Sequence, residues 1–298
     1  MPSDTAAPPP SVARDISYAS SAESAAGKAL IRLLENATGR RRLMARAAGY
    51  EAEVASGRDF WQVMLDRYGL RLEFLSGSLD LIPRTGPLVV VANHPFGILD
   101  GLVMGHILAQ RRGDFRILAH RVFRRAAELD RVILPISFDG TPEALQLNIQ
   151  TRAEALRHLS DGGAIGIFPG GTVATAPAPF GQPRDPVWRG FTARLVTRSQ
   201  ATVVPVYFDG HNSRLFQVAS HLNYALRMAL LIREFRARTD APVRLAVGAP
   251  IPPATLTPLA GDTRAVMDAL RTATYSLSPD PSDPLRLGHE FEAHHKKR

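Results

Sequence analysis

From Pro87 onward the chain alternates short apolar runs with longer stretches of helical periodicity. Short apolar runs are typical of buried strands, and the longer stretches are typical of helices that pack on them. Alternation of this kind favours a sheet with helices on both faces. The expected strands are Leu88–Ala92, Arg116–Ala119, Val132–Ile136, Ala164–Phe168, Thr202–Phe208 and Val243–Val247.

Helices are expected between these strands. The best start signal lies at Pro142, because Thr141 can cap a helix in which Pro142 and Glu143 occupy the first turn. We therefore predict an α/β fold with a mixed, mainly parallel central sheet, flanked by helices on both faces, and an N-terminal amphipathic helical cap. The expected helices are Leu99–Gln110, Val122–Leu129, Pro142–Leu159, Trp188–Ser199, Ser213–Ala237 in one or two pieces, and Thr263–Ser276.

Four segments differ in composition. Residues 1–20 are Pro-rich and are predicted to be a disordered tail, and residues 279–298 read as a polar C-terminal tail. Between them we expect an N-terminal helical region at 21–80 and an α/β domain at 81–278. The first residues hold no apolar stretch of the kind a signal peptide needs, and no run of about 18 apolar residues occurs. A cytoplasmic protein without an ordinary spanning helix is expected.

The charge is lopsided, with 36 basic against 28 acidic residues for a net charge of +8. Only three basic residues are lysines, and the arginine fork suits phosphate and carboxylate groups. An anionic partner is expected, although nucleic acid, lipid headgroups and acidic proteins remain open. Ala29–Ala48 and His221–Arg238 are basic and amphipathic, so either could lie on an anionic bilayer or pack on the domain. The first is the better candidate for membrane contact.

The most informative motif follows the first strand of the α/β domain. It reads Asn93-His94-Pro-Phe96-Gly97-Ile-Leu-Asp100, and Gly101 follows it. Gly97 permits a tight turn, so His94 is expected on the loop at the carboxyl end of the strand and Asp100 in the first turn of the next helix. An aspartate beside a histidine fixes its tautomer and leaves the other ring nitrogen to take a proton from a hydroxyl.

This motif resembles that of the lysophospholipid acyltransferase superfamily, the relatives of 1-acylglycerol-3-phosphate O-acyltransferase. The common form is Asn-His, four residues and Asp, whereas His94 and Asp100 enclose five. The longer spacing resembles the haemolysin-like branch, some of whose members resemble bacterial aminolipid O-acyltransferases. The resemblance implies that His94 is the general base and Asp100 its orienting partner, and that Asn93, Phe96 and Gly97 contact the substrate.

A second motif of the family, Phe-Pro-Glu-Gly-Thr, is matched by Phe168-Pro169-Gly170-Gly171-Thr172. Its glycines let backbone N–H groups approach a ligand, so these five residues are expected to bind substrate. Gly170 replaces the glutamate of the family, and Val173 stands where many members have a basic residue. Both changes argue against a simple glycerol phosphate acceptor.

Three weaker matches complete the resemblance, which spans roughly residues 86–252. Arg121, in Ile117-Leu-Ala-His-Arg121, is expected near the acceptor's head group, the alternative being a solvated charge. Val203-Val-Pro-Val-Tyr207 resembles an apolar family strand, and Gly210-His-Asn-Ser-Arg-Leu-Phe216 resembles the haemolysin-like branch without a mechanistic role.

The resemblance implies an enzyme of bacterial membrane lipid biosynthesis, peripheral on the inner face of the cell membrane. It would move a fatty acyl group from acyl-CoA or acyl-carrier protein to the hydroxyl of a lyso-lipid. A lyso-aminolipid is the first choice of acceptor, and lysophosphatidic acid or another lysophospholipid is the alternative. No cofactor, metal or nucleic acid is implied, and an anionic membrane surface is the expected partner besides the two substrates.

Other classes fit less well. A basic binding protein without chemistry would need a recognition motif, and none is present. A serine hydrolase would need a Gly-x-Ser-x-Gly elbow, which is also missing. Without cysteine, there can be no disulfide, thiolate metal site or cysteine nucleophile. A zinc site could be suspected near the end of the chain, at His289, Glu290, His294 and His295. Zinc-binding histidines on a helix lie four residues apart, and this spacing is absent between His289 and His294, so a charged tail is the better interpretation.

Overall fold

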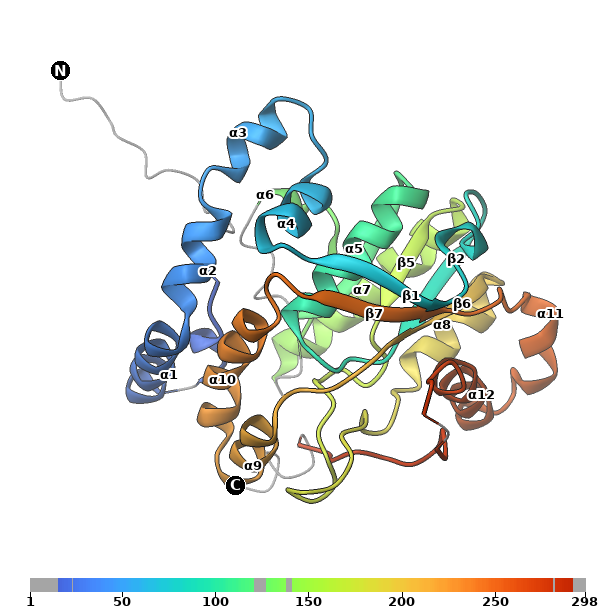
Figure 1. Cartoon of the computed structure of the whole chain (residues 1–298). Coiled ribbons are helices and arrows are strands. Elements are labelled where there is room, and N and C mark those ends of the chain that lie inside the picture. The colour runs from blue at the N-terminus through green and yellow to red at the C-terminus, as the bar shows by residue number, and fades with distance from the viewer. Residues whose placement is uncertain (1–15, 23, 121–126, 138–140, 281, 292–298) are drawn as a thin grey trace.

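The computed structural model describes residues 16–22, 24–120, 127–137, 141–280 and 282–291. Its centre is a seven-stranded sheet with the strand order β1-β7-β6-β2-β5-β3-β4 (Figure 1). The strands are β1 (Arg71–Ser76), β2 (Leu88–Ala92), β3 (Phe115–His120), β4 (Ile133–Ile136), β5 (Ala164–Ile167), β6 (Thr202–Phe208) and β7 (Pro242–Val247).

The sheet is mixed and mainly parallel, as predicted. The run from β6 through β2, β5 and β3 to β4 is parallel throughout. β7 is antiparallel to β6, and β1 is parallel to β7. β2 lies at the centre, where Val91 stands opposite Pro205 of β6 and Ile167 of β5. The carboxyl ends of β2, β5 and β6 therefore meet at one edge, where sites of such sheets form.

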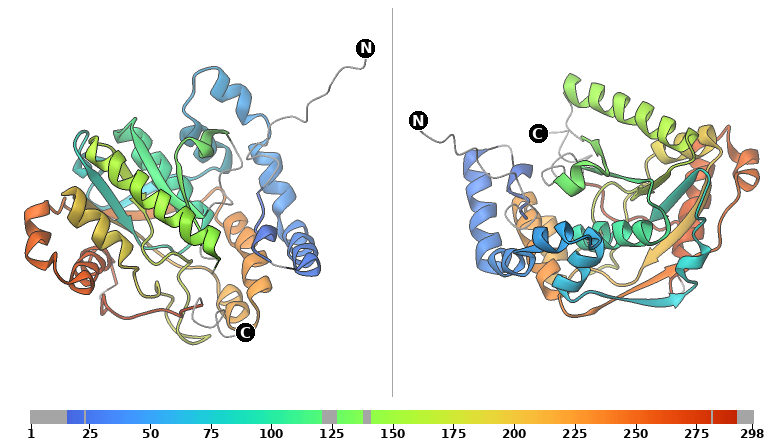
Figure 2. Two further views of the ribbon diagram at one scale, coloured as in Figure 1. Left: turned by 180° about the vertical axis from the view of Figure 1, so that it is seen from behind. Right: turned by 90° about the horizontal axis from the view of Figure 1, so that it is seen from above.

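Helices cover both faces of the sheet, also as predicted (Figure 2). The long helices are α1 (Ala25–Thr38), α5 (Ile98–Arg111), α7 (Pro142–Ser160), α10 (Tyr224–Ala237) and α12 (Thr263–Tyr275). The shorter ones are α2 (Arg40–Ala47), α3 (Tyr50–Ala55), α4 (Phe60–Tyr68), α6 (Ala127–Asp130), α8 (Phe191–Ser199), α9 (Arg214–Leu222) and α11 (Pro253–Leu256). Single 3₁₀ turns lie at η1 (Ala19–Ser21), η2 (Leu79–Leu81) and η4 (Thr257–Leu259).

Two apolar cores lie on opposite faces of the sheet, because successive strand side chains point to opposite sides. Leu88, Val90 and Ala92 of β2 pack in the core that α4, α5 and α10 complete. Val89 and Val91 pack in the core of α7, α8 and α12. All five residues of β2 are fully buried, which explains why its sequence is a continuous apolar run rather than an alternating one.

The stretch expected to be helical in one or two pieces forms two helices, α9 and α10, divided at Asn223, whose side chain accepts the N–H groups of Ala225 and Leu226. The structure differs from the sequence prediction elsewhere. β1 lies inside the segment 21–80, which is predicted to be helical. α8 begins at Phe191, after the predicted start at Trp188. Most of the helix predicted at 122–129 falls outside the described residues.

The N-terminal helices pack against α10. Glu35 of α1 is buried and accepts hydrogen bonds from Ser17 Oγ and the Tyr18 N–H, both at 2.6 Å. Burial raises the pKa of the Glu35 carboxyl above its ordinary value. In the described part of the chain no helix is long and apolar enough to cross a membrane. The association of this region with a membrane stays a prediction.

Candidate active site

His94 lies on the loop between β2 and α5, at the carboxyl edge of the sheet. Its backbone is held from both sides, because the His94 N–H donates to Asp185 Oδ1 at 3.1 Å and the His94 carbonyl accepts the Ala174 N–H at 2.7 Å. Gly97 has a φ of +86°, a left-handed conformation that favours glycine, and forms the cap from which α5 starts. The backbone of the loop is therefore held independently of the His94 side chain.

Asp100, in the first turn of α5, points back at this loop. Its Oδ2 atom accepts the backbone N–H groups of Phe96 at 2.7 Å and Gly97 at 3.0 Å. The same oxygen lies 2.9 Å from Nδ1 of His94, and the Asp100 side chain is completely buried. The distance suits a hydrogen bond, but the geometry is not that of a formed one. Catalytic hydrogen bonds often tighten only when substrate binds.

The His94 ring stacks on Phe168, the first residue of the second motif, with centroids 4.3 Å apart and 27° between the planes. Nδ1 is buried, yet 18% of the His94 side chain remains exposed. Nε2 is consequently the nitrogen that remains to meet a substrate. The two motifs, which are separated by more than seventy residues in the sequence, are thus in contact in the fold.

Asn93 joins the ends of β2 and β6. Its amide nitrogen donates to the Phe208 carbonyl at 2.9 Å, and its amide oxygen accepts the Phe208 N–H at 2.7 Å. Only 3% of Asn93 is exposed. In this structure the side chain therefore braces the loop, and its predicted contact with substrate stays a prediction.

Phe96 is buried beneath a cation. The Arg238 guanidinium carbon lies 3.6 Å from the Phe96 ring centroid, and the guanidinium donates to the His211 carbonyl at 2.7 Å. Burial lowers the pKa of Arg238, although the nearby Asp100 carboxylate opposes that shift. Phe96 thus packs the floor of the loop and links it to the end of α10.

The second motif turns sharply after β5. The Gly171 N–H donates to the Phe168 carbonyl at 3.0 Å, and the Arg189 N–H donates to the Pro169 carbonyl at 2.9 Å. Gly171 has a φ of +70°. Within the described residues, the N–H of Gly170 has no hydrogen-bond partner in this turn.

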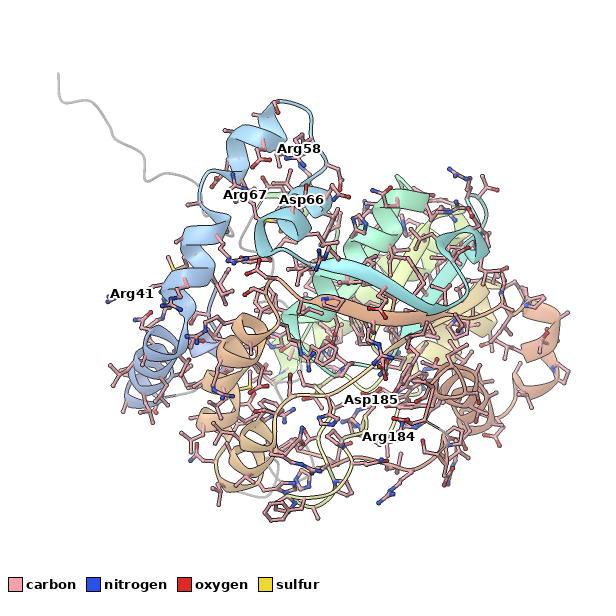
Figure 3. All side chains as sticks on the ribbon, in the orientation of Figure 1. Arg41, Arg58, Asp66, Arg67, Arg184 and Asp185 are labelled. Atoms are coloured by element: carbon pink, nitrogen blue, oxygen red, sulfur yellow. The ribbon has the colours of Figure 1, made fainter. Side chains whose placement is uncertain are left out.

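Asp185 is the site residue that sequence reasoning missed. It lies on the loop between β5 and α8, next to Arg184 (Figure 3), and is fully buried. Besides holding His94, its carboxylate accepts Nε1–H of Trp188 at 2.9 Å. Burial raises the pKa of the Asp185 carboxyl, and the charge of Arg271 partly offsets this. The only sequence signal was an aspartate flanked by proline, three residues before a tryptophan.

A buried cation supports the end of the second motif. Arg227 of α10 donates to Thr172 Oγ1 at 3.1 Å and to the Val173 carbonyl at 2.8 Å. It is only 1% exposed, and burial lowers its pKa to about 10. From the sequence, Arg227 is merely part of a basic helix, because Thr172 and Val173 lie more than fifty positions away.

The weaker matches are placed as follows. Val203–Tyr207 lies in β6 beside β2, and Ser213 caps α9 by accepting the Phe216 N–H. Arg121 lies outside the described residues, so its predicted role near the head group stays a prediction. His289 packs on His221 with ring centroids 4.6 Å apart, and in the described ranges no cluster of three potential metal ligands occurs.

A family model described as "Acyltransferase" matches residues 52–281, most of the chain and both site motifs. The chain belongs to this acyltransferase family. The enzyme is similar to two curated lyso-glycine lipid O-acyltransferases. That of Phocaeicola vulgatus is 26% identical over 203 residues, which are 66% of this chain and 70% of the relative. That of Bacteroides thetaiotaomicron is 22% identical over 214 residues, 68% of this chain and 74% of the relative.

A solved structure also aligns with this acyltransferase. It is the 1-acyl-sn-glycerophosphate acyltransferase of Thermotoga maritima, with a TM-score of 0.44 and 15% sequence identity. The alignment covers 86% of this chain and 98% of that one.

The two positions that depart from the family pattern, Gly170 and Val173, are both closely packed in this acyltransferase. A Cβ added to Gly170 would lie 3.2 Å from Cβ of Asp185, so the space beside this position is already occupied. Val173 is 6% exposed and packs in the apolar core. Neither position presents a charged side chain to the site.

Proposed function

We propose that this acyltransferase moves a fatty acyl group from an acyl thioester to the hydroxyl of a lyso-aminolipid, with His94 as general base. The observation that carries the proposal is the buried Asp100 carboxylate 2.9 Å from Nδ1 of His94. A carboxylate there favours the tautomer with the proton on Nδ1 and stabilises the imidazolium that forms. Nε2 is then left as a base on the exposed side of the ring.

The chemistry needs such a base because an alcohol is a weak nucleophile until its proton is removed. As the hydroxyl oxygen attacks the thioester carbonyl, Nε2 of His94 takes its proton. When the carbon–sulfur bond breaks, the imidazolium returns that proton to the leaving thiolate. The acyl group passes directly to the acceptor, with no acyl-enzyme intermediate. The unpartnered N–H of Gly170 is our candidate donor to the oxyanion.

The preference for an aminolipid rests on what surrounds the second motif. Val173 is apolar and buried, and the donors of Arg227 are directed to Thr172, Val173 and the hydroxyls of Thr175 and Ser220. This loop therefore offers no free cation for an acceptor phosphate among its described residues. The two lyso-glycine lipid O-acyltransferases support the same acceptor class.

We further propose that the enzyme binds the anionic inner face of the cell membrane. α1 is packed against α10, yet Leu30 and Leu33 remain 45% and 66% exposed. Lys28 on the same helix, and Arg41 and Arg42 at the start of α2, are also exposed. A helix region that exposes both apolar and basic side chains suits an anionic interface.

The test is a transfer assay with purified protein, labelled acyl-CoA or acyl-carrier protein, and a panel of lyso-aminolipids and lysophospholipids. We expect an ester product with a lyso-aminolipid and its loss in His94→Ala. Product only with lysophosphatidic acid or another lysophospholipid would overturn the acceptor assignment. Equal product from wild type and His94→Ala would overturn the role of His94, and no product with any pair would reject the proposed activity.

A further inference from the structure

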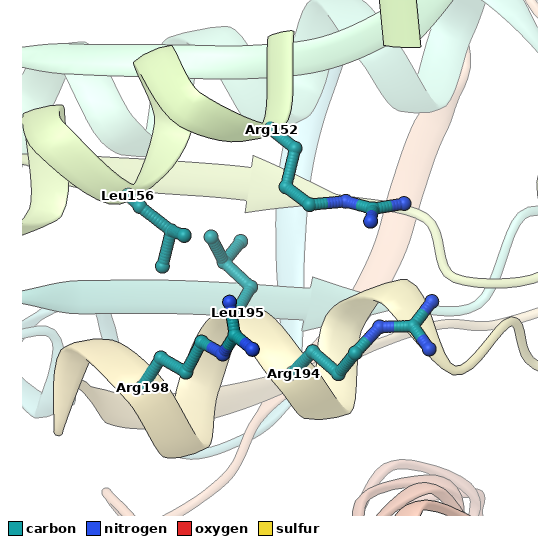
Figure 4. Close-up of a pocket in the computed structure, with 5 residues that line it drawn as sticks. All are labelled: Arg152, Leu156, Arg194, Leu195 and Arg198. Carbon is teal, nitrogen blue, oxygen red and sulfur yellow. The ribbon is translucent and has the colours of Figure 1, made fainter. Parts of the chain in front are cut away.

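A hollow of about 150 Å³ lies between α7 and α8, on the face of the sheet opposite α5 (Figure 4). Two leucines face each other across it and form its apolar part, while three arginines line the rest. The lining residues are Arg152, Leu156, Arg194, Leu195 and Arg198.

The three arginines have no carboxylate partner in the described part of the chain. Several arginines elsewhere in the protein form ion pairs with a carboxylate, as Arg46 does with Asp240 and Arg244 with Asp209. Arg152 is held by its packing on the Phe191 ring, 5.5 Å from the centroid, and its buried Nε has no hydrogen-bond partner among the described residues. The hollow is thus a positively charged site without its own counter-charge.

An apolar stripe leads along α7 to this hollow. Leu145 and Ile149 are 63% and 54% exposed. Leu145, Ile149, Arg152 and Leu156 follow the spacing of one helix face. The surface therefore combines an apolar stripe with a cationic end over more than two helical turns.

This surface is oriented toward the catalytic edge. α7 follows β4 and α8 follows β5, so both helices begin near the carboxyl ends of the parallel strands. In Figure 4 the side chains of Arg152 and Arg194 extend in the direction in which the strand arrows point. That direction is the edge where His94 lies.

We propose that the α7–α8 surface docks the acyl donor, and that this donor is a small acidic acyl-carrier protein. The inference rests on the proposed function and names its donor. An acidic amphipathic helix would place apolar side chains on Leu145 and Ile149 and carboxylates on the three arginines, which is a helix-in-groove contact. The stripe ends in a hollow between two helices, a shape that a convex partner helix can fill and a flat bilayer cannot.

The test compares two double variants with the same change in charge. Arg194→Glu/Arg198→Glu alters two exposed residues of α8, and Arg84→Glu/Arg131→Glu alters two exposed arginines in the turns before β2 and β4, at the opposite edge. For the α8 pair we expect the KM for palmitoyl-acyl-carrier protein to rise by about tenfold or more, with kcat and the KM for palmitoyl-CoA nearly unchanged. The control pair should leave all three values near wild type.

Binding of the unacylated holo-carrier protein, followed by fluorescence anisotropy, gives a readout that does not depend on turnover. Loss of binding in the α8 pair alone supports the docking site even if the acceptor is wrongly assigned. Unchanged binding and KM, equal weakening in the control pair, or an equal effect on palmitoyl-CoA would each overturn it. Loss of binding to anionic vesicles with unchanged carrier-protein binding would also overturn it and assign the surface to the membrane.

Discussion

The carboxylate of Asp185 accepts the backbone N–H of His94 at 3.1 Å, across 91 positions of sequence. It also stands against Gly170, where a Cβ would approach the Asp185 Cβ to 3.2 Å. Many family members carry a glutamate at the position of Gly170, so this chain supplies a buried carboxylate next to the same turn from a different loop. Asp185 acts through the backbone of His94 and is therefore a positioning residue.

Asp185→Asn should weaken both the fold and the reaction. The amide oxygen can accept only one of its two donors, so either the His94 N–H or the Trp188 indole N–H faces an amide N–H. We expect a loss of roughly 1 to 3 kcal/mol in unfolding free energy. Displacement of the His94 loop should lower kcat by up to about 10²-fold with little change in KM. Urea titration and steady-state kinetics measure both, and an unchanged kcat in a destabilised variant would show that Asp185 is structural only.

Asp100→Asn isolates the electrostatic part of the His94 pair. The amide oxygen can take the place of Oδ2, accept the N–H groups of Phe96 and Gly97 and still lie beside Nδ1 of His94, so α5 keeps its start but the negative charge beside the ring is lost. Without that charge the imidazolium that forms during proton transfer is less stable, and kcat should fall by about 10²- to 10⁴-fold. Asp262→Asn is the matched control, because Asp262 also caps a helix through two backbone N–H groups but lies on α12. Equal losses in both variants would contradict the assignment.

Asn93→Ala tests whether this residue braces the site or touches substrate. The change leaves the buried N–H and carbonyl of Phe208 without partners and should lower the unfolding free energy by roughly 2 to 4 kcal/mol. Asn148 forms the same two-bond bridge to Ser137 and provides the control. We expect Asn148→Ala to lose less stability, since Asn148 is half-buried, and to keep its activity. A raised KM for the acceptor in Asn93→Ala, without loss of stability, would indicate substrate contact instead.

The sequence was sufficient for the central strands and for the His94 motif because these signals are local. β2 is a run of buried residues with a glycine turn after it, and the next helix starts within a few positions. β1 was missed for the opposite reason: as an edge strand, its pattern from Arg71 to Ser76 contains no fully buried residue. An edge strand that exposes Arg71 and Glu73 has no apolar run to read.

The supports of the site could not be predicted, because their partners meet only in the folded chain. Asp185 and Arg227 reach the two motifs from a loop and a helix far along the sequence, and nothing local marks either one. The sequence of the C-terminal segment likewise gives no sign that it packs against the site. It reads as a polar tail, yet the N–H groups of Gly288 and His289 donate to the carbonyls of Asp185 and Thr175 at 2.8 and 3.0 Å.

The free energy of unfolding should decrease as the pH is lowered, because of His106 of α5. The residue is 8% exposed, and burial lowers its pKa below the ordinary value of 6.5. Below pH 6.5 the unfolded chain therefore binds a proton that the folded chain resists, and the unfolding free energy decreases until the folded pKa is passed. His106→Gln removes this contribution. Urea titrations at pH 7.5 and about 5.5 should give a smaller loss for the variant than for wild type, by at most about 1.4 kcal/mol per pH unit; equal losses would contradict the assignment.

The exposed leucines of α1 should govern membrane contact independently of the α7–α8 surface. Leu30→Ser/Leu33→Ser removes the two exposed apolar side chains of α1, so partition into anionic vesicles should fall by about tenfold or more. Because both side chains are exposed, the fold should not change. Leu145→Ser/Ile149→Ser removes a similar exposed apolar area from α7 and is the control. Co-sedimentation with vesicles of mixed zwitterionic and anionic lipid measures the partition. Loss only in the α7 pair would move the membrane contact to that helix, whereas loss only in the α1 pair would show that the enzyme meets the bilayer through its N-terminal helices.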